Sequence, residues 1–153
     1  SEILTSEYPY VLQVQSVQGN YKCEATLITS ILALTAAHCI HGLSPDAIKV
    51  VSGQHNIKGK TTKPQFRNLT QIIIHENFNQ VTLEDDIALL VLQNGFRIGS
   101  EMDVTVIPNE VVKSEGWVEY TFLHRDPGQF VVAETPVSLI PSQECAILSQ
   151  ANR

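Results

Sequence analysis

The sequence has 153 residues, of which 43% are hydrophobic and 17% are charged. These values predict a folded chain of about one domain and exclude a disordered one. The formal net charge is −6 and the lysines and arginines are scattered, so neither a nucleic-acid surface nor a polybasic membrane patch is expected. No apolar run approaches the ~20 residues that a membrane-spanning helix needs.

Short β-strands dominate the predicted elements, taken in chain order. Residues 10–16 alternate between two faces, with Leu12 and Val14 on one of them, which predicts a half-buried strand. Residues 87–92, IALLVL, are apolar without interruption, which predicts a strand buried on both faces. Further strands are expected at 22–28, 31–37, 48–53, 70–75, 117–123 and 130–139. Many short strands separated by turn residues indicate a barrel or a sandwich.

One helix is predicted, over residues 142–148, where Ser142 follows Pro141 and can serve as the N-cap. A weak boundary falls near residues 94–103, where the apolar pattern breaks. The sequence contains no internal repeat at a fixed spacing and no low-complexity tract.

Three features bear on the cellular compartment. The first ten residues, SEILTSEYPY, contain no signal peptide, which a mature secreted protein would have lost. Asn68-Leu69-Thr70 is a glycosylation sequon that fits secretion, although a plain surface asparagine is the alternative. The three cysteines, Cys23, Cys39 and Cys145, are an odd number. In a secreted protein one of these thiols therefore pairs outside the set or stays free.

A histidine beside a cysteine, in LTAAHC at 34–39, is the first candidate for chemistry. His38 could be a catalytic base, a metal ligand or a core histidine with a satisfied hydrogen bond. A metal site would combine His38, Cys39 and His41, but no CxxC or HExxH pattern accompanies them, which disfavours it. The histidines at 55, 75 and 124 are interpreted as ordinary surface or loop residues.

A second stretch, DDIALL at 85–90, decides between these alternatives. LTAAHC and DDIALL, in this order, resemble the two signatures of trypsin-like serine proteases. Similar stretches cover almost the whole chain: EYPYVLQV (7–14), SGQHNI (52–57), IIIHENFN (72–79), SEGW (114–117) and VSLIPSQEC (137–145). The resemblance implies an all-β, chymotrypsin-like double β-barrel. Its first barrel would be complete in residues 1–100, and residues 101–153 would form the linker and the first part of the second barrel.

The resemblance assigns roles to two side chains. Peptide hydrolysis by a serine needs an adjacent general base, and imidazole suits this because its pKa lies near working pH. A carboxylate must hold that base in the right tautomer and stabilise the imidazolium. The resemblance implies that His38 is the base and Asp86 the orienting carboxylate, with Asp85 as a surface neighbour. It also implies a disulfide between Cys23 and Cys39.

No metal or other cofactor is expected. The loop after SGQHN binds calcium through carboxylates in some relatives, but here it reads IKGKTTKPQ, with lysines and no acid. Because calcium requires oxygen ligands, a calcium site is not expected in this loop.

The family's nucleophile is missing from this sequence. Nothing matches the Gly-Asp-Ser-Gly-Gly stretch, so this chain alone lacks the nucleophile, the oxyanion hole and the specificity pocket, and we expect it to be inert by itself. Cys145 matches a family cysteine whose partner lies downstream, and Arg153 is what a trypsin-like cut leaves behind. We therefore expect a secreted two-chain protein joined by an interchain disulfide at Cys145. A free thiol at Cys145 and an arbitrary end at Arg153 are the alternatives.

Several departures from the family pattern favour a zymogen-like or inactive form. The family's Ile-Val-Gly-Gly start is missing before Pro9, so the usual N-terminal ammonium is not available. Glu24 follows Cys23 where the family has a glycine near the catalytic serine, and Val118 replaces a glycine near the oxyanion region. Val112 stands where vertebrate members have a cysteine, which fits invertebrate members.

Two functional hypotheses follow from these residues. The first is a secreted serine endopeptidase whose partners are a complementary C-terminal chain, protein or peptide substrates and protein inhibitors. The second is a catalytically inert homologue that acts as a binding or adaptor protein. The residue in the nucleophile position of the complementary chain discriminates between them.

Overall fold

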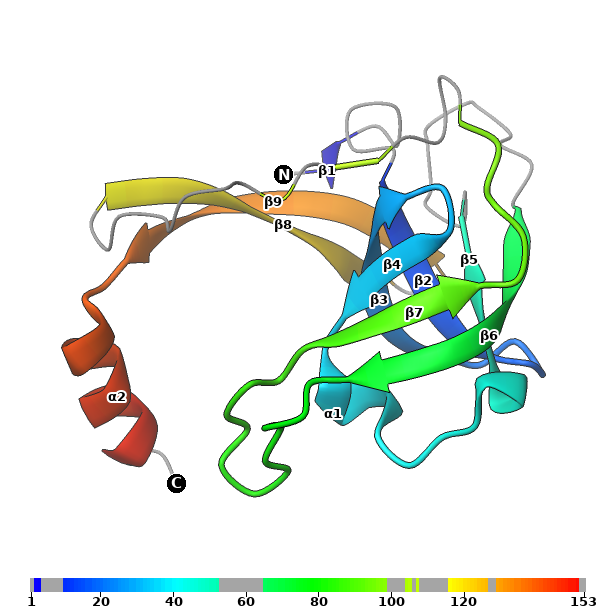
Figure 1. The fold of residues 1–153 in the computed structure, drawn as a ribbon. Coiled ribbons are helices and arrows are strands. Elements are labelled where there is room, and N and C mark those ends of the chain that lie inside the picture. Colours follow the sequence, from blue (N-terminus) through cyan, green and yellow to red (C-terminus); the bar gives the residue numbers. More distant parts are fainter. Residues whose placement is uncertain are drawn as a thin grey trace.

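The structure, a computed structural model, describes residues 2–3, 10–52, 65–98, 104–105, 107, 116–126 and 129–151. Its main feature is a closed barrel of six antiparallel strands in the order β2-β3-β4-β7-β6-β5 (Figure 1). These strands are β2 (Val11–Ser16), β3 (Tyr21–Thr29), β4 (Leu32–Thr35), β5 (Ile48–Val51), β6 (Phe66–Ile74) and β7 (Ala88–Leu92). The barrel expected from the sequence is therefore present.

Alternate side chains of each strand fill the barrel. In β3 the inward series Cys23, Ala25 and Leu27 is buried, and the residues between them are only partly buried. The fully buried side chains Leu12, Leu27, Ile48, Val50 and Leu90 form the centre of this core. Because side chains of a strand alternate between its faces, this pattern of period two places the remaining side chains on the outer wall.

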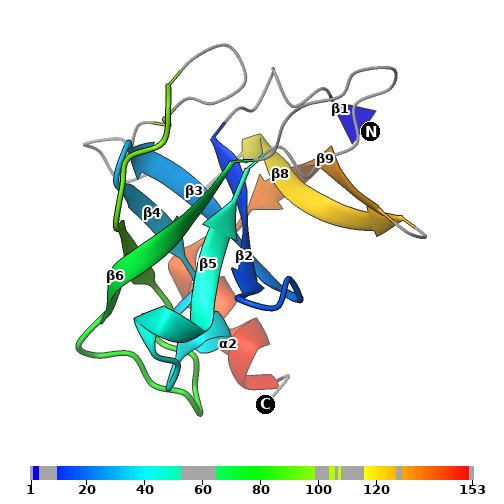
Figure 2. The same cartoon turned by 90° about the vertical axis from the view of Figure 1, so that its right-hand side faces the viewer.

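Strand β2 differs from its sequence prediction. A half-buried strand was expected, but all six of its residues are buried. Leu12 and Val14 belong to the barrel core, whereas Gln13 and Gln15 lie on the other face and hydrogen-bond to each other at 2.9 Å. Figure 2 shows β2 on the side of the barrel where β8 and β9 lie. The period of two was correct, but the strand's position in the fold buries its polar face as well.

Strand β7 is less buried than its sequence predicts. Burial on both faces was expected from IALLVL, but only Ala88, Leu90 and Leu92 are buried. Leu89 and Val91, on the outer wall, are only partly buried, because the described residues provide no layer that covers them.

The segment that carries His38 was also predicted incorrectly. A strand was expected over 31–37, but β4 ends at Thr35 and a one-turn helix, α1 (Ala37–Ile40), follows. A short 3₁₀ helix, η2 (Pro45–Ala47), comes next, where the Ser44 hydroxyl accepts the backbone N–H of Asp46. Helices of three or four residues are too short to give the apolar repeat by which a helix is recognised in a sequence.

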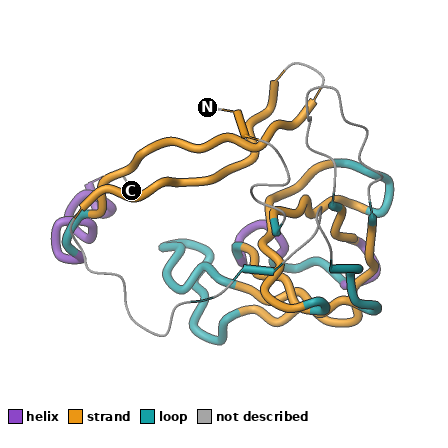
Figure 3. The backbone as a smooth tube through the Cα atoms, turned by 90° about the horizontal axis from the view of Figure 1, so that it is seen from above, coloured by secondary structure: helices purple, strands orange, loops and turns teal. Residues whose placement is uncertain are grey.

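The second sheet is open. It has three strands in the order β1-β9-β8, which are β1 (Glu2–Ile3), β8 (Gly116–Asp126) and β9 (Gln129–Leu139). Figure 3 shows the long β8–β9 hairpin running past the barrel. Helix α2 (Ser142–Ala151) follows β9 at the far end of the hairpin, where a helix was predicted (Figure 1). No helix in the described part of the chain is long and apolar enough to span a membrane.

Candidate active site

His38 is presented by the first turn of α1. The chain leaves the barrel at Thr35, Ala36 is extended, and helix α1 begins at Ala37. Ala37 and Ile40 are fully buried and anchor this turn in the core. The His38 side chain points the other way and is 52% exposed. Burial of one face of a short helix thus directs the imidazole to the surface at one end of the barrel.

Asp86 is presented by the loop between β6 and β7. Within this loop the Asn79 side-chain oxygen accepts the backbone N–H groups of Val81 and Thr82, which closes a tight turn. Leu83 and Asp85 both have positive φ, at 60° and 53°. This conformation is uncommon for residues other than glycine, and it holds the chain in a path that brings Asp86 to α1.

The structure brings His38 and Asp86 together. Oδ2 of Asp86 lies 2.5 Å from Nδ1 of His38, and Oδ1 accepts the backbone N–H of His38 at 2.7 Å. The second contact satisfies an N–H in the first helical turn, which has no partner within the helix. Because the carboxylate holds both the ring and the backbone of His38, the orientation of the imidazole is fixed and Nε2 is directed away from Asp86.

The electrostatics favour an ionised carboxylate at Asp86. Partial burial raises the pKa of this carboxyl, but the hydrogen bonds from the side chain and backbone of His38, the charge interaction with His38 and a backbone hydrogen bond from Ala37 together lower it by more. The net pKa lies below the usual value for aspartate. An ionised Asp86 requires a proton on Nδ1 of His38, which leaves Nε2 of the neutral ring as the hydrogen-bond acceptor.

The Cys23–Cys39 disulfide joins the barrel wall to α1. Cys23 lies in β3 and Cys39 is the residue after His38, with a Cα–Cα distance of 6.2 Å between the cysteines. The sulfur of Cys39 lies 3.6 Å from Nε2 of His38. The bridge therefore restrains the same turn that carries the imidazole.

Three further residues singled out in the sequence are exposed. Cys145 is an exposed free cysteine in α2, Asn68 is exposed on β6, and Asp85 is exposed beside Asp86. Among the described residues, no group of three His, Cys, Asp or Glu side chains is arranged to hold a metal ion. The N-terminal residue, His55, Val112, Arg153 and residues 58–64 of the lysine-bearing loop lie outside the described residues.

Three features of the site were not predicted from the sequence. These are the backbone hydrogen bond from His38, the contact between the Cys39 sulfur and Nε2, and the edge-on packing of His41 against Phe78 with ring centroids 5.5 Å apart. The first two depend on the geometry of α1, which the sequence pattern did not reveal. His41 had been considered only as part of a metal site.

Relatives of known sequence share part of this chain. The fibrinolytic enzyme isozyme C of Lumbricus rubellus is 32% identical over 106 residues, which are 67% of this chain and 43% of that protein. Trypsin of Sus scrofa is 35% identical over 100 residues, which are 65% of this chain and 41% of that protein. This chain thus spans less than half the length of these relatives.

Solved structures share the fold. A structure described as "Structure of GrC" superposes with a TM-score of 0.79 at 27% identity, covering 99% of this chain and 69% of that one. Human heparin binding protein gives the same TM-score of 0.79 at 18% identity, covering 95% of this chain and 66% of that one. The fold class expected from the sequence, a chymotrypsin-like double barrel with a complete first barrel and a partial second one, is confirmed. The family model described as Trypsin matches residues 1–150, and this chain belongs to the trypsin-like serine protease family.

Proposed function

We propose that this chain supplies the general base and the orienting carboxylate of a serine endopeptidase. His38 is the base and Asp86 the carboxylate. The observation that carries the proposal is the double contact of Asp86 with the ring and the backbone of His38, at 2.5 and 2.7 Å. This contact leaves Nε2 available to take a proton from a hydroxyl, which is the step that activates a serine nucleophile.

The chemistry proceeds through the imidazole. Nε2 accepts the proton of the attacking hydroxyl as the bond to the substrate carbonyl forms, and later delivers it to the leaving amine. The ionised Asp86 stabilises the imidazolium while it exists, without itself taking the proton. The low pKa of Asp86 supports this role because the carboxylate stays charged at neutral pH.

The nucleophile and the rest of the second barrel are proposed to come from polypeptide outside these 153 residues. We place the division between the two barrels near residue 100, with β1 of the N-terminal segment added to the second sheet. In the described part of the chain, β8 pairs with β9 alone, so its other edge can receive a further strand. Cys145 would form a disulfide with this added polypeptide, in a two-chain or zymogen-derived protein.

Secretion is part of the proposal. The Cys23–Cys39 disulfide supports it because such bridges persist in oxidising compartments. Asn68 is exposed and is the proposed glycosylation site. The proposed partners are protein or peptide substrates and protein inhibitors. Loss of a glycan mass in Asn68→Gln, expressed in secreting eukaryotic cells, would identify the modified residue, whereas an unchanged mass would exclude it.

A fluorophosphonate probe tests the catalytic role. The natural protein, with all the polypeptide it carries, is incubated with the probe, and adducts are read by intact mass. One adduct is expected in the natural protein and none in His38→Ala, because the serine needs its base. Asp85→Asn is the matched control and should label normally. Absence of an adduct in correctly folded natural protein would contradict the proposal.

A catalytically inert homologue is the second candidate. Glu24, partly buried on β3 directly after the bridged Cys23, favours it, because the family has a glycine at this point. In that case the barrel would serve as a binding or adaptor module. The variant Glu24→Gly of the natural protein discriminates between the two candidates. If the variant forms a probe adduct that the unsubstituted protein does not form, a reactive serine is present and Glu24 blocks it. No adduct in either form would favour the inert homologue.

A further inference from the structure

The sulfur of Cys39 lies against the imidazole of His38. Sγ of Cys39 is 3.6 Å from Nε2 of His38, which is a contact distance for sulfur. On the other side of the ring, Nδ1 is held by Asp86 at 2.5 Å. A sulfur, a base and an orienting carboxylate therefore form a continuous chain of contacts within these 153 residues. Such an arrangement activates a cysteine nucleophile when the sulfur carries a proton.

In the bridged protein the Cys39 sulfur has no proton to give, because it is joined to Cys23. A dithiol reductant removes this obstacle. One of its thiolates attacks a bridge sulfur and its second thiol closes a ring, so that two electrons and two protons pass to the protein and two cysteine thiols result. Cys23 is 9% exposed and belongs to the core, whereas Cys39 is only partly buried. Cys39 is therefore the thiol that solvent reaches after reduction.

The turn that carries Cys39 is held by more than the bridge. Its neighbours Ala37 and Ile40 are fully buried and anchor the turn in the barrel core. Oδ1 of Asp86 accepts the backbone N–H of His38 at 2.7 Å. Because none of these contacts involves a cysteine side chain, they keep Cys39 beside the imidazole when the bridge is open.

We propose that reduction by a dithiol turns Cys39 into a modification site for soft electrophiles, with His38 as its base and Asp86 as the orienting carboxylate. Nε2 of His38 takes the thiol proton, and the resulting thiolate is the nucleophile. With iodoacetamide, the bond from Sγ to carbon forms as the carbon–iodine bond breaks, and iodide leaves with the electron pair. The proposal does not rest on the proposed function, because it requires no serine.

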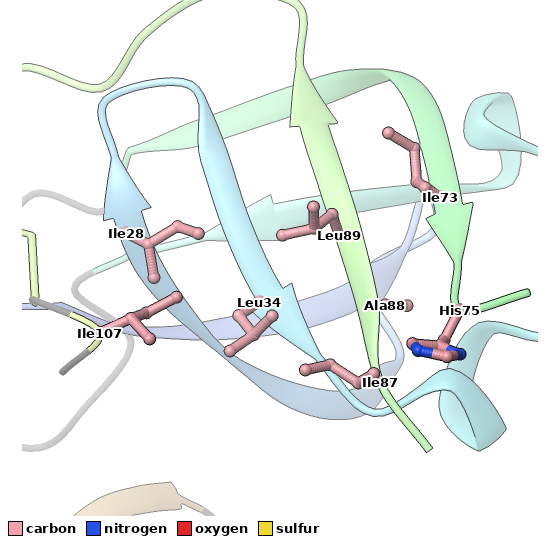
Figure 4. Close-up of a pocket in the computed structure, with 8 residues that line it drawn as sticks. All are labelled: Ile28, Leu34, Ile73, His75, Ile87, Ala88, Leu89 and Ile107. Atoms are coloured by element: carbon pink, nitrogen blue, oxygen red, sulfur yellow. The ribbon is translucent and has the colours of Figure 1, made fainter. Parts of the chain in front are cut away.

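Two side chains elsewhere in the chain serve as controls. Cys145, on α2, is an exposed free thiol, so its reactivity reports accessibility alone. His75 is an exposed histidine in a different setting, along an apolar groove of the outer barrel wall with Ile73 and Ile87 (Figure 4). Its Nδ1 accepts the backbone N–H of Asn77 at 3.0 Å. Removing the His75 ring therefore tests for effects of losing any exposed histidine.

Alkylation of the natural protein by iodoacetamide, after reduction with dithiothreitol, measures the reactivity of each thiol by peptide mass mapping. Cys39 should react at least about tenfold faster than Cys145, since an unassisted thiol is only a few per cent thiolate at pH 7. The two rates should converge in concentrated urea. A Cys39 rate no higher than that of Cys145, a difference that persists in urea, or loss of the native far-UV circular dichroism on reduction would overturn the proposal.

The variant Cys23→Ala frees Cys39 without any reductant and leaves other bridges of the natural protein intact. Its Cys39 should be alkylated at the rate measured in the reduced protein. A Cys39 that reacts only as fast as an unassisted thiol in this folded variant would also refute the proposal.

The variant His38→Ala separates a base from a steric shield. Loss of a shielding ring would leave alkylation of Cys39 unchanged or faster, whereas loss of the base should slow it about tenfold. Asp86→Asn should also slow it, because an asparagine no longer holds the imidazole in the tautomer with a free Nε2. The matched controls His75→Ala and Asp85→Asn should leave the rate unchanged. An unchanged or faster rate in His38→Ala would show that the imidazole does not activate this thiol.

Discussion

Asp86 holds His38 at two points, through Nδ1 of the ring and through the backbone N–H of the same residue. The carboxylate therefore fixes both the helical turn that carries the imidazole and the direction in which its free nitrogen points. One side chain thus links the stability of α1 to the chemistry of the site. The predictions below separate these two contributions.

His38→Ala removes the proposed base. We expect turnover of the natural protein to fall by about six orders of magnitude, the scale measured for removal of the histidine base in serine proteases. Because the His38 side chain is half exposed, the fold should survive, so far-UV circular dichroism and the thermal midpoint should change little. Activity retained at the natural level would show that another group accepts the proton.

Asp86 also makes stability depend on pH in the acid range. Its pKa is lowered in the folded state, so it contributes stability that is present above the aspartate value of about 3.9 and is lost as the pH falls through the lower folded value. Urea midpoints of unfolding, measured between neutral and strongly acidic pH, should fall less steeply with decreasing pH in Asp86→Asn than in the natural protein.

The control for this pH series is Asp85→Asn. Asp85 is exposed and has φ of 53°, a conformation that asparagine tolerates well. Its pH profile should follow that of the natural protein. If Asp86→Asn and the natural protein gave superimposable profiles, the contact with His38 would contribute nothing to stability.

The disulfide should stabilise the barrel by limiting the conformational freedom of the unfolded chain. The two cysteines are 16 residues apart, and a loop of that size corresponds to about 3 kcal/mol in the chain-entropy description. The double variant Cys23→Ala/Cys39→Ala should lose free energy of unfolding on this scale in denaturant titrations. A loss well under 1 kcal/mol would mean that packing alone holds α1 against the wall.

The barrel core should be sensitive to loss of volume at its centre. Leu90 is completely buried in β7, so Leu90→Ala should lower the free energy of unfolding by about 2–5 kcal/mol. Val81→Ala, in an exposed loop position, should change it by less than about 0.5 kcal/mol. Equal effects of the two substitutions in the same titration would contradict the observed core.

Local features of the fold could be predicted because they depend on neighbouring residues. The alternation in 10–16 and the apolar run in 87–92 gave strands at nearly the observed positions, β2 and β7. The predicted burial of these two strands was wrong in both cases. The outer face of β2 is buried and that of β7 is not, because burial depends on which other elements lie against the strand and not on its own pattern.

The sequence by itself determined the strand periodicity, the family signatures and the residue types available for catalysis, since each is a property of short stretches. Only the tertiary structure decided that residues 38 and 86, 48 positions apart, meet through two hydrogen bonds. It also decided that Cys23 lies beside α1 and that the outer side chains of β3, β4 and β7 join into one groove. The physical reason is that barrel closure sets these distances, and closure results from pairing strands that are remote in the chain.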